Sequence, residues 1–252
     1  MRALRIEIRA PVVSFRHPHF LIGRQPTYEM PPPSTIYGFI ASVLGELPAP
    51  DGLQFAYRFT FQARASDYEH QHIITAARPR QSFSVGQTRF PFSVNVEIQP
   101  HARDFLFQAR LVLYLNALEL AEAFRQPVFP VILGRSQDLA EITEVREVSL
   151  ETRAGAYLEH TLLPFSLRPR LTLGYTVWMP RYIGPPPHRQ PIFDRFVLLR
   201  ERVYAGQVER AEDLGIRRLL KLDGHAESWL VDPETPVDRG VCRGIIFHSF
   251  VG

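Results

Sequence analysis

The sequence predicts an α+β protein. Its first part is a ferredoxin-like, or RRM-like, domain, and its second part is β-rich. Segments with an apolar residue at every second position indicate strands, and segments with apolar residues three and four positions apart indicate helices. They follow one another as strand, helix, strand, strand, helix, strand, which is the split βαβ order of ferredoxin-like domains. Many functions use this fold, and the RNP1 aromatic signature of a standard RRM is absent from the third strand, so the fold alone sets no function.

The first strand and first helix have the clearest patterns. Apolar and charged residues alternate through residues 1–10. A helical pattern of apolar residues runs from Ile36 to Leu47. The prolines at residues 31–33 block an earlier start of that helix, and Ser34 is therefore its expected N-cap.

The remaining elements of the first part are equally regular. Residues 55–64 and 105–115 alternate as half-buried strands. A second helix is expected over residues 117–124, and it stops before Pro127. A weaker strand is expected at residues 142–150.

Two regions lie outside this core pattern. Residues 66–103 are too long for a plain turn between paired strands, so we expect a projecting hairpin or loop there. Beyond it, the expected C-terminal elements are strands at residues 171–183, 193–204 and 244–250 and a short helix within residues 209–223. The predicted division is a domain at residues 1–152, which carries the insertion, and a smaller β-rich region at residues 153–252.

The charge composition permits nucleic-acid binding. The formal net charge is +3, and of the 29 lysines and arginines only Lys221 is a lysine, which leaves 28 arginines. Arginine forms bidentate contacts to phosphate and stacks on bases. A GC-rich or thermophilic genome also replaces lysine by arginine. Genome composition is therefore an alternative explanation to nucleic-acid binding for the excess of arginine.

Several classes of protein are excluded or disfavoured. No stretch approaches the ~18 consecutive apolar residues of a membrane-spanning helix, so no membrane partner is expected. The N-terminal strand pattern lacks the apolar region of a signal peptide, which predicts a cytoplasmic protein. The single cysteine, Cys242, excludes a disulfide scaffold and every multi-cysteine zinc site.

Catalytic and metal-binding signatures are mostly missing. The chain has no G-x-S-x-G, P-loop or G-x-G-x-x-G motif. Two H-x-H pairs, His17/His19 and His70/His72, would share a face of a strand, but nothing supplies an obvious third metal ligand. We therefore expect no metal, no cofactor and no catalytic residue.

Three stretches without aspartate or glutamate are the positive signal, at residues 8–28, 70–96 and 160–193. Each contains arginines together with aromatic residues. Cations for phosphates and flat rings for bases are typical of a protein that binds single strands. A shuffled sequence would produce a gap as long as the last one about as often as not, so only the three together favour nucleic acid. The middle stretch supplies the candidate RNA contacts Arg78, Arg80 and Arg89.

The loop that leads into the first helix is the sharpest local feature. Helix N-termini bind phosphates because their free N–H groups present positive potential, and two arginines precede this terminus. A buried loop closed by prolines is the alternative. The candidate RNA-binding residues here are Arg16, Arg24, Gln25, Tyr28, Ser34, Thr35 and Tyr37.

Short segments of the first fifth of the chain also form a specific pattern. They are Arg9-Ala10-Pro11, Ser14-Phe15-Arg16, Pro26-Thr27-Tyr28, the run from Pro31 to Gly38, and Leu44-Gly45-Glu46. Together they closely resemble the N-terminus of the Cas five family, the CRISPR-associated subunits of type I Cascade surveillance complexes within the RAMP superfamily. Leu133-Gly134-Arg135 is similar to the Gly-Arg loop of that family, which adds Arg135 to the RNA-binding candidates.

The resemblance implies a fold and a role. The fold is a ferredoxin-like body with a projecting β-hairpin thumb at about residues 66–103 and a variable C-terminal part. The role is a non-catalytic subunit that holds the 5′ handle of the CRISPR RNA in antiviral defence. Such a subunit caps the filament of Cascade backbone subunits beside the Cascade large subunit, and it meets target DNA only indirectly.

Two other functions remain open at this stage. One branch of the family cuts precursor CRISPR RNA as a metal-independent endoribonuclease that uses tyrosine, lysine and histidine. Here Tyr37, His70 or His101 would have to form the acid–base set, with Arg103 as the cation, because the only lysine lies far along the chain. The other alternative is an unrelated ferredoxin-like protein that binds a small ligand.

Overall fold

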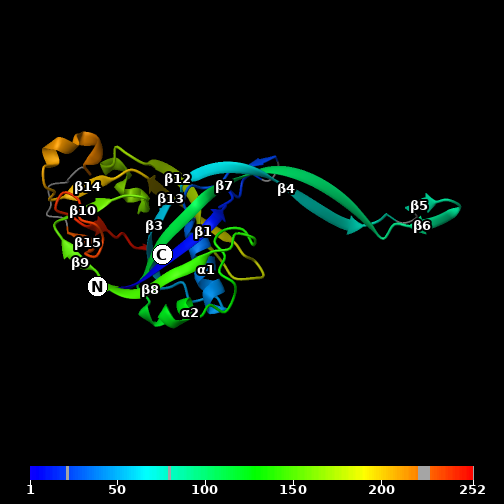
Figure 1. The fold of residues 1–252 in the computed structure, drawn as a ribbon, viewed down its shortest axis with the longest axis horizontal. Helices are drawn as coiled ribbons and strands as arrows, with labels where there is room; N and C mark the ends of the chain where they lie inside the picture. The colour runs from blue at the N-terminus through cyan, green and yellow to red at the C-terminus, as the bar shows by residue number, and fades with distance from the viewer. Residues whose placement is uncertain (21–22, 79–80, 221–227, 252) are drawn as a thin grey trace.

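A seven-stranded sheet forms the centre of this computed structural model (Figure 1), which describes residues 1–20, 23–78, 81–220 and 228–251. The strand order is β17-β3-β7-β1-β8, with β2 and β4 also paired to β7. All neighbours along that path are antiparallel. The strands are β1 Arg2–Val13, β2 Arg24–Gln25, β3 Gln54–Thr60, β4 Ala63–Ala76, β7 Val94–Leu115, β8 Glu141–Ser149 and β17 His248–Ser249.

The register of the central strands follows from the alternation in the sequence. Ile6 lies opposite Leu113 and Ile8 opposite Leu111, and all four side chains are at most 1% exposed. A one-residue slip would turn these side chains to the other face of the sheet. The predicted alternation of residues 1–10 is therefore the pattern that fixes the pairing of β1 with β7.

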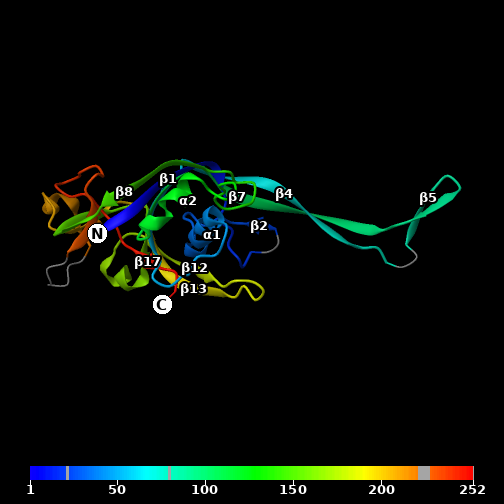
Figure 2. The same ribbon diagram turned by 90° about the horizontal axis from the view of Figure 1, so that it is seen from below.

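Helix α1 (Pro33–Leu44) covers the apolar face of the sheet, with the hairpin of β12 (Tyr175–Ile183) and β13 (Pro191–Leu199) on its far side (Figure 2). The prediction of Ser34 as its N-cap is wrong, because the N-cap is Pro32, which makes no side-chain cap hydrogen bond. Pro33 fits the first helical position since its missing N–H would be unpaired there in any case. The helix ends at Gly45, whose φ of +81° favours glycine, so it stops before the predicted end.

The second helix is shorter than the sequence predicts. Residues Leu118–Leu120 form a 3-10 turn, and only Ala121–Arg125 form α2. Pro127 leaves no room for an extension at the C-terminal end. The chain then returns to the sheet as β8, the outer strand beside β1, close to its predicted position. No helix in the described part of the chain is long and apolar enough to cross a membrane.

The region between β3 and the second half of β7 folds as a long hairpin. Strands β4 and β7 pair without interruption from Ala63 opposite Phe107 to Ala76 opposite Val94. Beyond them, β5 (Ser82–Val85) and β6 (Thr88–Pro91) form a small second hairpin. Figure 1 shows the whole arm extending far from the body. Strand β7 is continuous from this arm into the centre of the main sheet.

The C-terminal part forms two further sheets, with strand orders β14-β10-β16-β15-β9 and β11-β13-β12. Their bounds are β9 Glu151–Arg153, β10 Gly155–Leu158, β11 Thr161–Pro164, β12 Tyr175–Ile183, β13 Pro191–Leu199, β14 Val203–Gly206, β15 Trp229–Asp232 and β16 Arg243–Gly244. The predicted strand at residues 193–204 is thus two strands, and residues 244–250 hold mostly irregular chain. The helix expected within residues 209–223 is represented by two 3-10 turns, Ala211–Leu214 and Ile216–Arg218, while residues 221–223 lie outside the described residues.

The main hydrophobic core crosses the predicted domain boundary. Leu162, Met179 and Phe196 of the C-terminal part belong to the same buried cluster as the central strands and α1. The division of the chain into two domains at residue 152 therefore remains a prediction. Packing ties the two parts together on the face of the sheet that α1 covers.

Candidate nucleic-acid interface

The base of the hairpin is organised around a buried carboxylate. Asp104 in β7 is 0% exposed, and its Oδ2 accepts hydrogen bonds from Arg64 Nη2 at 2.6 Å and from Arg24 Nη2 at 3.4 Å. The Ser66 hydroxyl donates to the other carboxylate oxygen. Burial alone would raise the pKa of Asp104, but these three donors outweigh it and the pKa is lowered. Two guanidinium groups thus share one carboxylate oxygen, which leaves positive charge in excess.

A second ionic cluster anchors the Gly134-Arg135 loop beside the first. The Asp138 carboxylate accepts from Arg135 Nη2 at 2.8 Å and from the backbone N–H of Ser14 at 3.0 Å. Arg135 also bonds Glu69 of β4. Gly134 has φ +115°, and a Cβ there would lie 2.8 Å from the Ser14 carbonyl oxygen, so only glycine fits.

Arg135 is therefore a structural residue at the hairpin base. Its side chain is only 12% exposed and both of its partners are carboxylates. Burial would lower the pKa of Arg135, but Asp138 and Glu69 raise it overall. The prediction that it contacts RNA does not fit this placement, because the guanidinium is already engaged.

Three arginines remain exposed at this base. The side chain of Arg24 is 70% exposed and that of Arg64 is 38% exposed. Arg16 is exposed on the same loop, and its backbone forms an antiparallel β-bridge with Thr27. Burial is the main cause that lowers the pKa of Arg103, and the positive charge of Arg16 lowers it further. Cations that face solvent beside one buried carboxylate suit a phosphate, which accepts charge-assisted bidentate bonds. Arg16, Arg24 and Arg64 form what we call the basal arginine surface.

Three predicted contacts are buried instead. Gln25 is 2% exposed, and Tyr28 and Tyr37 are each 3% exposed. The Tyr28 hydroxyl donates to the Trp178 carbonyl oxygen at 2.7 Å, and the Tyr37 hydroxyl donates to the Pro48 carbonyl oxygen. Burial raises the pKa of both tyrosines to about 12. We correct the prediction for these three residues because their side chains pack inside the body.

The helix start offers less than the sequence predicts. Ser34 and Thr35 are half-buried, and the Thr35 N–H donates to the Pro32 carbonyl oxygen at 2.8 Å. Since Pro33 has no N–H, the first turn presents at most the N–H of Ser34 to a ligand. Phosphate binding at this terminus therefore depends on the arginines beside it.

The hairpin arginines lie far from this surface. Arg89 is exposed on β6, and Arg78 is exposed between β4 and β5. Figure 1 shows β5 and β6 at the outer end of the arm. Arg89 Nε donates to the Ser82 hydroxyl across the tip. Arg80 lies outside the described residues. The predicted contacts thus separate into a group at the base and a group at the tip.

The two histidine pairs lie in different surroundings. His17 and His19 lie in a loop with a turn, and each stacks on a different ring, Tyr28 and Phe193 respectively. His70 and His72 are exposed on β4. Among the described residues, no three His, Cys, Asp or Glu side chains are grouped so that they could hold a metal ion.

Three residues of the alternative acid–base set, Tyr37, His101 and Arg103, have structural partners, whereas His70 is exposed on β4. The Tyr37 ring contacts Tyr182 and Phe250 in the core. His101 is 3% exposed with its Nε2 3.1 Å from Gln71 Oε1, and Arg103 pairs with Glu69 at 2.8 Å. Lys221 lies outside the described residues.

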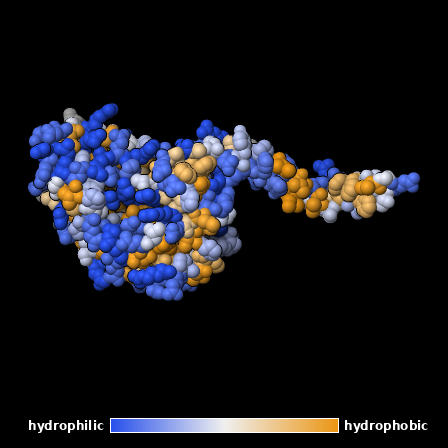
Figure 3. Space-filling model, viewed as in Figure 1, coloured by the Kyte–Doolittle hydropathy of each residue, from blue (hydrophilic) through white to orange (hydrophobic). Residues whose placement is uncertain are grey.

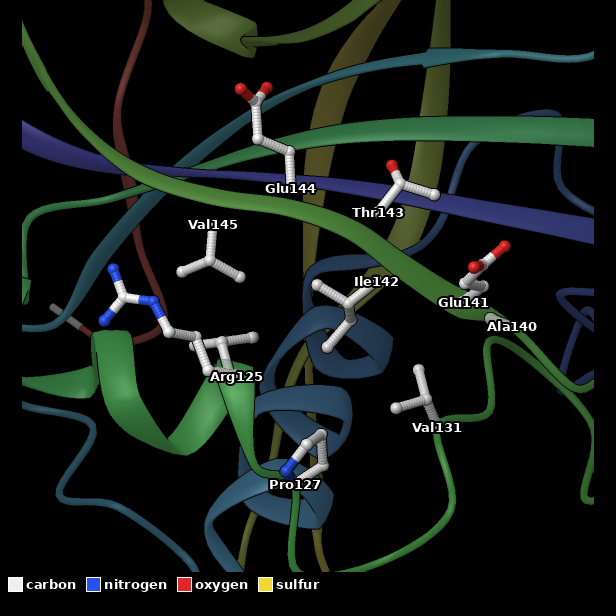
Figure 4. Close-up of a pocket in the computed structure, with 10 residues that line it drawn as sticks. Arg125, Pro127, Val131, Ala140, Glu141, Ile142, Thr143, Glu144 and Val145 are labelled. Carbon is white, nitrogen blue, oxygen red and sulfur yellow. The ribbon is translucent and has the colours of Figure 1, made fainter.

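A pocket of about 510 Å³ lies between α2 and β8 (Figure 4). Val131, Ile142 and Val145 form its apolar wall, Arg125 of α2 also lines it, and the side chains of Glu141 and Glu144 point away from it. The Glu144 carboxylate is paired with Arg5 and Arg146. The pocket does not belong to the basal arginine surface.

Sequence reasoning missed Arg64 and Asp104. One signal was present: Asp104 shares the inward-facing alternation of a strand with Leu106, and a carboxylate at such a position requires a cationic or hydrogen-bonding partner. The partner itself comes from β4, and only the pairing of β4 with β7 brings it there.

A comparison with protein families identifies the chain. A family model described as "CRISPR-associated protein (Cas_Cas5)" matches residues 3–181, which is more than half of the sequence. The chain belongs to the Cas five family. The matched region includes the hairpin, the basal arginine surface and the strands of the central sheet from β1 to β8. Of that sheet, β17 lies outside the match. The resemblance seen in the first fifth of the sequence is thereby confirmed.

Solved structures give weaker likenesses to this Cas five protein. A chain of a "CRISPR RNA-guided surveillance complex" has a TM-score of 0.49 and 15% identity, with 80% of this chain and 89% of that chain covered. A "CRISPR protein from Archaeoglobus fulgidus" has a TM-score of 0.42 and 7% identity, with 80% and 87% covered. A chain of a "Type III-B Cmr-beta bound to cognate target RNA and AMPPnP" has a TM-score of 0.42 and 9% identity, with 80% and 85% covered. No curated protein matches.

Proposed function

We propose that this Cas five protein is a non-catalytic RNA-binding subunit of a type I Cascade surveillance complex. In this proposal it holds the 5′ handle of the CRISPR RNA, caps the filament of backbone subunits and contacts the large subunit. Target DNA is met only indirectly. The body is a ferredoxin-like RAMP domain, and the long hairpin is its thumb. The order of the elements β1, α1, β3, β7, α2 and β8, with their strands arranged β3-β7-β1-β8, supports this description of the body.

One observation carries the assembly role: the hairpin has an apolar face that the described residues leave uncovered. Register places the side chains of Ile74 and Val96 opposite each other, with Ile98 next along the same face. The exposed fractions of these three residues are 65%, 53% and 56%. The opposite face carries polar residues such as Glu69, Glu97 and Gln99. Antiparallel sheets with such alternation bury the apolar face against a second layer, and Figure 3 shows apolar surface along the arm.

The outer end of the arm repeats this feature. Phe83 stacks on Phe90 with ring centroids 5.6 Å apart, and Phe92 lies 5.0 Å from Phe83. All three are more than 40% exposed. A two-stranded hairpin is marginally stable alone in water. A partner that covers both apolar surfaces would stabilise the arm, and a neighbouring backbone subunit is the partner that we propose.

The RNA-binding role rests on the basal arginine surface. Its three arginines face solvent where the arm leaves the body, next to the buried carboxylate of Asp104. Such a surface favours a phosphate backbone at the junction between the body and a bound partner. No observation on the described residues favours a ribonuclease, since the hydroxyl of Tyr37 and the guanidinium of Arg103 are held by structural partners.

Assembly is the first test. Full-length protein is co-expressed with the backbone and large subunits and with a repeat array, and the complex is purified through a tag on the backbone subunit. The expected result is incorporation of the wild-type chain together with RNA whose 5′ ends map to the repeat. The double variant Val96→Ser/Ile98→Ser is expected to lose incorporation, whereas the control Val237→Ser, also exposed, keeps it. Normal incorporation of the double variant contradicts the assembly role.

Binding and cleavage are the second test. The purified chain is mixed with labelled repeat-derived single-stranded RNA and, separately, with duplex DNA over a range of salt concentrations. We expect preference for the RNA, an affinity that falls with salt because counterions are released, and intact RNA after prolonged incubation. Specific cutting at the handle boundary would replace the proposal by the ribonuclease alternative.

A further inference from the structure

Three aromatic side chains from two distant segments stack on one another at the surface of the body. The rings of His19 and Phe193 have centroids 5.5 Å apart at 29°, and those of Phe193 and Trp178 have centroids 5.9 Å apart at 7°. Phe193 is half-buried between its neighbours, whereas Trp178 is 50% exposed. We call these three residues the aromatic stack.

Strand pairing and one hydrogen bond fix the aromatic stack. In the β12–β13 hairpin, Pro180 lies opposite Phe193 and Trp178 lies opposite Arg195, which puts the two rings on one face as diagonal neighbours. The buried Tyr28 hydroxyl donates to the Trp178 carbonyl oxygen at 2.7 Å. The loop that carries His19 is thereby tied to β12. The exposed indole is held in place before any ligand arrives.

The surroundings of the aromatic stack are positive. Its members come from residues 8–28 and 160–193, two of the three stretches that lack aspartate and glutamate. The carboxylates that follow these stretches are engaged: Glu29 with Arg200 at 3.3 Å, and Asp194 with Arg181 at 3.5 Å. Arg195 is exposed directly across from Trp178, with its guanidinium 4.3 Å from the Phe165 ring centroid.

These features match one class of ligand. A half-exposed indole that stacks on a parallel ring and has an arginine opposite it binds a nucleobase by stacking and its phosphate by charge. An apolar protein segment would gain from the ring but not from the cations. A base in a duplex has no free face, so the ligand is single-stranded.

We propose that the aromatic stack binds an unpaired base of single-stranded RNA on the free face of Trp178, with Arg195 meeting an adjoining phosphate. This inference rests on the proposed RNA-binding function and adds a base-binding site that lies on the body, apart from the basal arginine surface.

The experiment compares two labelled probes on the full-length chain: a single-stranded oligouridine, and an oligomer of the same length with abasic sugars. The two have equal charge, so their difference reports contacts to bases. Trp178→Ala is expected to weaken binding of the oligouridine by about fivefold to a hundredfold and to leave binding of the abasic oligomer unchanged. Trp178→Phe retains most of the affinity. The control Phe129→Ala, an exposed aromatic residue on the loop after α2, changes neither.

A second measurement does not depend on the fold of that variant. The protein has two tryptophans, and Trp229 is 9% exposed. In Trp229→Phe, the remaining indole fluorescence reports Trp178 alone, and we expect the oligouridine to quench it more strongly than the abasic oligomer does.

The outcomes separate the two proposals. If the wild type binds both probes equally, or if Trp178→Ala still prefers the oligouridine as the wild type does, the aromatic stack is no base site while the proposed function stands. If the fluorescence of Trp178 responds only to added protein subunits, the site takes a protein partner instead. If the wild type binds neither probe nor repeat-derived RNA, the proposed function falls and this inference falls with it.

Discussion

The two halves of strand β7 lie in different environments. From about Asp104 onwards its inward-facing side chains are fully buried, with Leu106, Leu111 and Leu113 each 0% exposed. Before that point, Val94, Val96 and Ile98 have the same alternation and are about half exposed. In the body half of β7 these side chains pack against a second layer of the same chain, whereas in the arm half no described residue covers them. The body is thus completed by its own residues, and in the proposed assembly the arm is completed by a partner.

Removal of the arm would test that division most strongly. Residues 72–98 are deleted, and Gln71 is joined to Gln99, its partner in register, through an Asn-Gly turn. The clusters around Asp104 and Glu69 stay intact, so we expect a folded body with a melting temperature close to that of the wild type. Incorporation into the complex should be abolished. Thermal unfolding and co-purification on the same preparation measure both effects, and a body that fails to fold would show that the arm is part of its core.

Acid unfolding would test the packing of the body, which is the buried half of this comparison. His248 is buried between Phe55 and Phe196, its Nε2 lies 3.0 Å from the Leu162 carbonyl oxygen, and burial lowers its pKa to about 4. The hydrogen bond to Leu162 opposes this lowering of the pKa, the charge of Arg181 adds to it, and the charge of Asp194 opposes it. Because the unfolded chain takes up the proton near pH 6.5, stability is full above that pH and is lost as the pH falls towards 4.

The expected loss is about 3 kcal/mol of unfolding free energy between pH 7 and pH 4. Urea unfolding at a series of pH values measures it. In His248→Gln, which keeps a donor for Leu162, this pH dependence should largely disappear. An unchanged slope in the variant would assign the acid sensitivity to other groups.

The joint between body and arm is the next target. Asp104→Ala leaves Arg24, Arg64 and Ser66 without their shared acceptor, and it should lower the unfolding free energy by about 2–3 kcal/mol, since hydrogen bonds between charged groups are lost at a buried position. This corresponds to a drop in melting temperature of roughly 4–12 °C. Asp67→Asn, an exposed acid on the same arm, is the matched control and should change little.

The smallest effect on stability is expected at the basal arginine surface. Arg24→Ala removes only the longest of the contacts to Asp104, so the melting temperature should hardly change. RNA affinity should fall by about tenfold, because ~1.4 kcal/mol is a factor of ten. Arg24→Lys should restore part of it, as lysine lacks the bidentate fork. If the alanine variant melts far lower while its folded fraction binds RNA normally, Arg24 belongs to the structure and not to the interface.

Local sequence patterns were sufficient for the regular parts of the molecule. The alternation in β1 and β3, the proline run before α1 and the order of the elements all follow from the period of apolar residues. The end of α1 was misjudged, because Gly45 stops the helix although apolar residues continue to Leu47. The short strands after residue 200 carry too few residues for a period to be recognised.

The candidate site was harder to predict because it is made by pairing over long distances. Arginines were recognised as a class, but whether one is free depends on carboxylates elsewhere: Arg135 is neutralised by Asp138 and Glu69, whereas Arg24 stays largely exposed. Tyr28 and Trp178 lie in different acid-free stretches, and nothing local indicates that they meet. The stretches themselves were informative, since two of them supply the aromatic stack.

The continuity of β7 gives the arm a mechanical property. The strand runs for 22 residues from the outer arm into the middle of the main sheet, a length of about 70 Å at roughly 3.3 Å per residue. No loop interrupts it, and its one residue with a left-handed backbone, Gln108, lies within the body. In the proposed assembly, a partner bound to the arm would therefore be held at a set distance and in a set orientation relative to the central sheet. The length of the hairpin is set by the rise per residue of a single β-strand.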